Sequence, residues 1–137
     1  MTLRLWVLRK NLGIFACAVA AGLLVSTGGT IAGEADVTEA SARSTGERVF
    51  TFSVTVRHDD AGWDHYANRW QVLAPDGTVL GERVLLHPHE TEQPFTRSLS
   101  GVAIPPGIDE VITRAGDSVH DFGGEELRLS LPSDGGS

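Results

Sequence analysis

The histidines carry most of the chemistry that this chain can offer. The chain has five of them, and four stand directly beside an Asp or Glu: His58, His65, His89 and His120. Imidazole nitrogen is a good ligand for zinc, copper and nickel, and a carboxylate beside it can ligate as well or hold the ring in one tautomer. One hypothesis for the chain is therefore a transition-metal site.

The stretch LLHPHETEQPF, residues 85–95, adds a His-x-His pair. His87 and His89 are two positions apart, so on an extended segment both side chains point to the same side, and Pro88 stiffens the backbone between them. A histidine from another loop would complete a three-nitrogen set for copper or zinc. The predicted site takes its ligands from His65, His87, His89 and His120, with Asp64 and Asp121 as carboxylates that orient the rings.

A structural role for the same histidines stays open. His-x-His occurs by chance, no three-ligand spacing in the chain matches a named metal motif, and a loop histidine can simply hydrogen-bond a backbone carbonyl. The sequence has no Gly-x-Ser-x-Gly elbow, so no nucleophile is indicated and we do not predict an enzyme. Two functions remain: a binding or accessory domain for an unidentified protein or envelope component and, as the alternative, a copper- or zinc-binding protein.

Residues 1–32 have the organisation of a secretory signal peptide. Two arginines and a lysine precede an apolar run, and small residues follow it. The run covers about 14 residues, fewer than the roughly 20 that a membrane-spanning helix needs. We therefore expect cleavage near Gly33, a periplasmic or secreted product and no membrane span after cleavage. Cys17 lies inside the apolar run and not at its end, where the cysteine of a lipid-attachment motif would stand.

The expected mature chain is strongly acidic. Residues 1–32 hold three of the 11 basic residues and none of the 18 acidic ones, so the rest of the chain carries a formal charge of −10. A surface of that sign repels nucleic acid and favours cations or basic partners. Cys17 is the only cysteine, so the exported chain would form no internal disulfide. Its length of about 105 residues suits one domain with one core.

Six stretches of the chain alternate apolar and polar residues with the period of a β-strand. In the first, Phe50, Phe52, Val54 and Val56 share one face, and the residues between them are polar. Turn sequences such as PDG, in which Gly77 suits a positive φ, separate the stretches. The predicted strands lie within residues 48–58, 63–74, 78–87, 94–104, 109–116 and 125–132, after a flexible leader at 33–47 and before a disordered tail at 133–137.

Six short strands joined by turns predict an all-β fold, a single antiparallel β-sandwich over residues 48–132. Trp70 and the stretch SLSGVAIPPGIDEVITRA resemble the buried tryptophan and the E and F strands of immunoglobulin-like and fibronectin type III-like domains. This resemblance implies about 6–7 strands, although both cysteines of true immunoglobulins are absent. GWDHYANRW, LLHPH and EQPFTRSLSG also resemble small, uncharacterised exported bacterial proteins, which implies export and a β domain.

The resemblance also implies where the histidines lie. In the strand order of such a sandwich, the first strand ends, the second begins, the third ends and the fifth ends at the same pole. RHDD, WDHY, LLHPHE and SVHD stand at those four points. All five histidines, with the acidic residues beside them, are therefore expected at one end of the domain.

Overall fold

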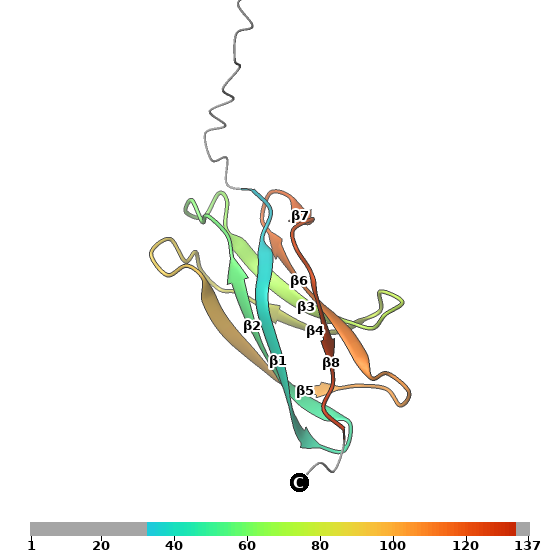
Figure 1. Cartoon of the computed structure of the whole chain (residues 1–137). Coiled ribbons are helices and arrows are strands. Elements are labelled where there is room, and N and C mark those ends of the chain that lie inside the picture. Colours follow the sequence, from blue (N-terminus) through green and yellow to red (C-terminus); the bar gives the residue numbers. More distant parts are fainter. Residues whose placement is uncertain (1–32, 134–137) are drawn as a thin grey trace, which may run out of the picture.

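The structure, a computed structural model, describes residues 33–133, and the predictions made for residues 1–32 and 134–137 lie outside this range. Within the range the chain forms two packed antiparallel sheets and no helix (Figure 1). The predicted all-β sandwich is confirmed. The strands are β1 Asp36–Gly46, β2 Val49–Arg57, β3 Ala67–Leu73, β4 Val79–Val84, β5 Phe95–Ala103, β6 Glu110–Asp117, β7 Asp121–Phe122 and β8 Leu127–Ser130.

The two sheets are unequal in size. The smaller has the order β1-β2-β5, and the larger has the order β4-β3-β6-β7, with β8 also paired to β6. Every pairing is antiparallel. β2 is central in the smaller sheet and β6 is central in the larger one, and both run toward the upper end of the sandwich in Figure 1. Residues that follow these two strands are therefore brought together from opposite layers.

β1 occupies most of the segment for which the sequence predicted a flexible leader, so that prediction for residues 33–47 is wrong. The strand pairs with β2 from Asp36 to Gly46. Val37 is buried, but Ala40 and Ala42, which also pack on the core, are small. Backbone pairing thus holds much of β1, and its side chains give little of the hydrophobic alternation by which a strand is recognised.

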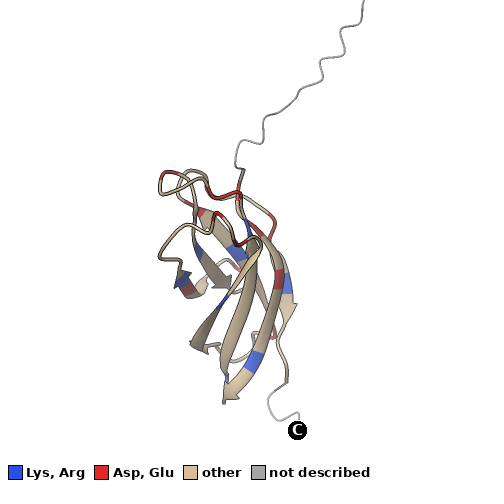
Figure 2. Ribbon diagram, turned by 90° about the vertical axis from the view of Figure 1, so that its left-hand side faces the viewer, with Lys and Arg blue, Asp and Glu red and all other residues tan. Residues whose placement is uncertain are grey.

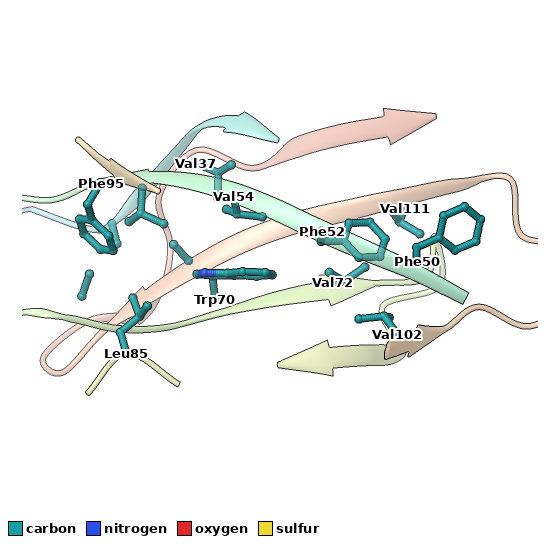
Figure 3. Packing of buried hydrophobic residues seen from close by; sticks show 14 of the residues in the cluster. Val37, Phe50, Phe52, Val54, Trp70, Val72, Leu85, Phe95, Val102 and Val111 are labelled. Carbon is teal, nitrogen blue, oxygen red and sulfur yellow. The ribbon is translucent and has the colours of Figure 1, made fainter. Parts of the chain in front are cut away.

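The core lies between the sheets and follows the predicted alternation. Phe50, Phe52, Val54 and Val56 of β2 are all fully buried. Trp70 of β3 is also fully buried and lies between the two layers, as Figure 3 shows. The predicted tryptophan core is confirmed. Other large buried side chains are Val37, Val72, Phe95, Ile104 and Val111.

The β3–β4 hairpin has the predicted turn. Gly77 has a φ of 91°, a value that glycine reaches without a Cβ clash. The N–H of Gly77 donates to the carbonyl of Ala74 at 2.9 Å, and the N–H of Ala74 donates to the carbonyl of Thr78 at 2.8 Å. The hairpin sets the register of β4 on β3 at the edge of the larger sheet.

The loops at residues 58–66 and 118–120 meet at the upper end of the sandwich (Figure 1). β7 pairs with the end of β6 beside them, and its two residues are too few to give a periodic signal in the sequence. Figure 2 shows Asp and Glu gathered in the loops of this end. No helix within residues 33–133 could span a membrane.

Candidate metal centre

The five histidines lie in one connected group at the end of the sandwich, as the strand order predicted. Asp60 links its two halves, because it accepts a hydrogen bond from the ring of His58 and another from the backbone N–H of His89. Three pairs of rings are in contact, with centroids 4.8 Å apart for His58 and His65, 4.9 Å for His65 and His120, and 4.6 Å for His87 and His89.

His58 follows β2 directly, and its side chain is fully buried. Alternate residues of β2 face the core, and His58 continues that face by one more step. Its Nδ1–H donates to Oδ1 of Asp60 across 2.5 Å. Asp60 is held in turn by the backbone N–H groups of Ala67 and His89, at 3.0 and 2.6 Å. When the ring of His58 is neutral, Asp60 thus holds its proton on Nδ1, and the lone pair is on Nε2.

Asp117 is the last residue of β6, and its side chain is also fully buried. Its Oδ1 accepts the backbone N–H groups of Val119 and His120 at 2.8 and 2.6 Å, which closes the turn after β6. Burial alone would raise the pKa of this carboxyl. The two backbone N–H donors, together with the positive charge that the rings of His120 and His58 carry when protonated, outweigh burial and hold the pKa of Asp117 below its ordinary value. Asp117 is therefore a buried carboxylate at neutral pH.

Three histidines direct a ring nitrogen at this carboxylate. Nε2 of His65 lies 3.2 Å from Oδ1 of Asp117, Nδ1 of His120 lies 3.2 Å from the same oxygen, and Nε2 of His58 lies 3.9 Å from Oδ2. The Nε2 atoms of His58 and His65 are buried and make no hydrogen bond with any part of the chain that the structure describes. Buried side-chain nitrogens normally have a partner, so this pair requires a physical explanation.

The donor atoms are spaced for a metal ion. His58, His65 and Asp117 each present one ligand atom, and these atoms all lie within 4.8 Å of one another. Around a tetrahedral zinc ion with bonds of roughly 2.0–2.1 Å, neighbouring ligand atoms are about 3.3 Å apart. The separations of 3.2 and 3.9 Å from the two imidazoles to Asp117 need only small side-chain movements to reach that arrangement. Two nitrogens and one oxygen suit zinc or copper, whereas calcium and magnesium prefer oxygen alone.

His89 has a different environment from the three rings around Asp117. It is buried, and its ring stacks on Phe95 with centroids 3.9 Å apart. Arg97 Nη2 donates to its Nε2 at 2.9 Å, so that nitrogen already has a partner. Burial lowers the pKa of His89, and the neighbouring positive charges of Arg97 and His87 lower it further. His89 is thus a packed, neutral ring whose backbone N–H helps to hold Asp60.

His87 is exposed, and its Nδ1 lies 3.1 Å from the carbonyl oxygen of Pro88. The rings of the predicted His-x-His pair, His87 and His89, contact each other. Neither ring belongs to the group of ligand atoms at Asp117. Of the four predicted ligands, the structure brings His65 and His120 to that carboxylate.

The two carboxylates predicted to orient the rings lie elsewhere. Asp64 is exposed, and the hydroxyl of Ser118 donates to its backbone oxygen at 3.4 Å. Asp121 is exposed and pairs with Arg69. The carboxylate that orients a ring is Asp60, by its contact with His58.

Strand phase was the signal that could have identified His58 and Asp117. His58 continues the buried positions 50, 52, 54 and 56, and Asp117 continues the buried positions 111, 113 and 115. A histidine and an aspartate that extend the inward faces of two strands must be buried at their ends. No comparable pattern identifies Asp60, because it lies in a loop whose path depends on the tertiary fold.

The chain is similar to a known protein. Over 100 residues the chain is 45% identical to a protein of Halomicrobium mukohataei described as a "Putative lipoprotein". The match covers 73% of this chain and 49% of the relative, so the chain spans about half the length of the protein it matches. No protein-family model matches the chain, and no solved structure matches it.

Proposed function

We propose that this chain binds a divalent transition-metal ion, zinc or copper, through Nε2 of His58, Nε2 of His65 and the carboxylate of Asp117. One observation carries the proposal. Two buried imidazole nitrogens without a hydrogen-bond partner converge on a buried carboxylate. An ion between them would give every one of these groups a partner.

Electrostatics at the site favours a cation. In the neutral ring of His58, Nδ1–H donates to Asp60, and Nε2 then presents a lone pair toward the carboxylate of Asp117. Two electron-rich groups facing each other in a buried site repel, and a positive ion between them turns that repulsion into attraction. The hydrogen bond from a ligating histidine to a carboxylate is also the usual way in which a metal-bound imidazole is oriented.

The surroundings would help an ion to reach the site. Acidic residues gather in the loops at this end of the molecule (Figure 2), and a field of one sign raises the local concentration of the opposite charge. Imidazole ligands then select transition metals over calcium and magnesium. The expected order of affinity is copper(II) above zinc(II), with magnesium negligible.

An exported, envelope-associated location fits this role. The relative from Halomicrobium mukohataei is described as a lipoprotein, and residues 1–32 of this chain have the organisation of a secretory signal. Mass analysis of the N-terminus of the periplasmic or secreted protein should find a chain that begins near Gly33. An intact Met1 chain in the cytoplasmic membrane would contradict this location.

A calorimetric titration tests the metal proposal. The full-length chain is purified without a histidine tag and carries Cys17→Ala, so that no thiol contributes a ligand. We expect one equivalent of zinc(II) or copper(II) to bind at pH 7.5 with a Kd below about 10 μM.

Two variants separate the proposed ligands from other histidines. Asp117→Asn retains an oxygen that can accept the backbone N–H groups of Val119 and His120, but it loses the negative charge. It should weaken metal binding by more than the roughly 10- to 100-fold that is lost when a residue contacts only a ligand and not the metal. His87→Ala removes an exposed histidine outside the group and should bind as the parent chain does. Parent protein without binding tighter than about 10 μM would refute the metal proposal.

Exposed apolar side chains at the same end favour a second candidate function, the binding of a protein or envelope component. Trp63, Leu86 and Val119 are 67%, 77% and 59% exposed, and each lies in a loop that carries a histidine. Apolar side chains gathered at a surface often mark an interaction site. Capture of one envelope protein by the parent chain and by a Val79→Ser control, and its loss with Trp63→Ala, would support this function; equal capture by all three chains would contradict it.

A further inference from the structure

We propose, resting on the metal site proposed above, that His120 is its fourth ligand and the ligand that leaves when the ion is exchanged. The site would then pass its ion to an incoming donor and would not hold it permanently. The cargo is a divalent transition metal, and the acceptor is any molecule that offers a nitrogen or sulfur donor to the exposed side of the site.

The burial of the ligands changes steadily across the site. The side chains of His58 and Asp117 are 0% exposed, that of His65 is 15% exposed, and that of His120 is 33% exposed. The site is therefore closed toward the core and open beside His120. The proposed set also has four protein ligands, as structural zinc sites do, but one of the four, His120, is partly exposed.

His120 lies beside the group, whose mutually close ligand atoms are those of His58, His65 and Asp117, and its ring would have to move toward His58 to join them. Its Nδ1 lies 3.2 and 3.3 Å from the two carboxylate oxygens of Asp117, and its ring is 4.9 Å from the ring of His65. Without an ion, Nδ1–H of His120 donates to Oδ2 of Asp117; an ion at the carboxylate would displace this hydrogen bond, and with the proton on Nε2 instead, Nδ1 would offer a lone pair as a third nitrogen ligand. Three imidazoles and one carboxylate make a four-coordinate set suited to zinc or copper.

The backbone of His120 is fixed, whereas its ring is partly exposed and contacts only Asp117 and the ring of His65 among the contacts described. Its N–H donates to Oδ1 of Asp117 at 2.6 Å, which anchors the turn. The same turn is joined to the loop of His65, because the N–H of Ser118 donates to the carbonyl of Tyr66 and the N–H of Tyr66 donates to the hydroxyl of Ser118. Rotation about side-chain bonds can therefore withdraw the imidazole without any change in the fold.

The exchange is a ligand substitution. The bond from the metal to Nδ1 of His120 breaks, and a bond from the metal to the incoming donor forms. His120 leaves as a neutral imidazole, and no electron is transferred.

The test uses cobalt(II) as a spectroscopic probe. The full-length chain with Cys17→Ala takes up one equivalent, and its visible absorption reports the number and geometry of the ligands. Transfer of cobalt to a competing chromophoric chelator is then followed by stopped flow. We expect His120→Ala to transfer its ion at least about tenfold faster than the parent, and His87→Ala, the matched control, to transfer it at the parent rate.

Free imidazole distinguishes a missing ligand from a structural defect. Added to cobalt-loaded His120→Ala, it should restore the parent spectrum and slow the transfer, because the vacated position faces solvent. A spectrum and transfer rate in His120→Ala that equal those of the parent would overturn the role of His120 while the metal site stands. Loss of all binding in His120→Ala, without rescue by imidazole, would overturn the role as well. A parent chain that binds neither cobalt nor zinc would instead remove the proposed function itself.

Discussion

Asp60 is the residue at which one substitution should disturb both the fold and the site. Its carboxylate is fully buried and accepts three hydrogen bonds, from the ring of His58 and from the backbone N–H groups of Ala67 and His89. Asp60→Asn keeps the size of the side chain but replaces one acceptor oxygen by an NH₂ donor. At least one of the three donors must then face another donor.

The magnitude follows from these contacts. The less costly orientation of the amide keeps Oδ1 toward His58 and Ala67 and leaves the N–H of His89 unpaired, which costs roughly 1–3 kcal/mol. The bond from His58 also loses its charged acceptor, and charged bonds exceed neutral ones by about 1 kcal/mol. The free energy of unfolding should therefore fall by roughly 2–4 kcal/mol, which lowers the thermal midpoint of a domain this size by about 10 °C or more.

Calorimetry and metal titration measure the two effects separately. Metal affinity should fall by roughly 10- to 100-fold, the usual cost of losing a carboxylate that orients a metal-bound histidine. Asp59→Asn, at the exposed neighbouring position, is the control and should leave both quantities near those of the parent. A thermal midpoint for Asp60→Asn within about 2 °C of the parent would refute the buried acceptor described here.

Three further predictions concern the fold. Trp70→Ala should cost roughly 3–5 kcal/mol in denaturant unfolding because its indole is fully buried, whereas exposed Trp63→Ala should cost less than about 0.5 kcal/mol, and equal losses would contradict the core. Since the pKa of His89 is lowered in the fold, its neutral ring contributes stability that is complete above about pH 6.5 and is lost as the pH falls below that value. With a chelator present to remove metal, the free energy of unfolding of His89→Asn, measured with denaturant, should therefore fall less between pH 7 and pH 5 than that of the parent. An equal fall in both proteins would contradict this prediction. A Cβ on Gly124 would lie 2.1 Å from a backbone oxygen of the segment before β1, so Gly124→Ala should lose roughly 1–3 kcal/mol while Gly46→Ala, with its nearest contact at 3.7 Å, unfolds near the parent midpoint.

The sequence predicted the strands in which apolar side chains lie on one face and polar side chains on the other. β2 alternates large apolar and small polar residues, so its position, its inward face and its place in a sandwich could all be inferred before the fold was seen. β1 could not, because only Val37 is a large inward side chain and the strand depends on pairing with β2. Local composition cannot report a pairing partner that lies elsewhere in the chain.

The sequence predicted the end of the sandwich at which the histidines lie, but not which of them face one another. Strand order was enough to bring five histidines to one end, because loop ends follow from topology. Which rings face one another depends on strand phase and on the path of each loop. As a result, the ring of His89 stacks on Phe95, whereas the ring of His58 faces Asp117. His-x-His spacing describes only the local backbone, and the ring contacts across loops decide the ligands.

If the proposed site binds its ion, the position of the ligands at the ends of β2 and β6 would link the metal supply to the lifetime of the domain. These strands belong to different sheets, so an ion held by His58 and Asp117 would cross-link the two layers, in a described range that contains no cysteine. By mass action, free metal at 100 times its Kd would add about 2.7 kcal/mol to the free energy of unfolding, a sizeable part of the roughly 5–15 kcal/mol typical of a domain. Metal-starved protein would therefore open more often and be degraded sooner, and its abundance would report how much metal the surroundings contain.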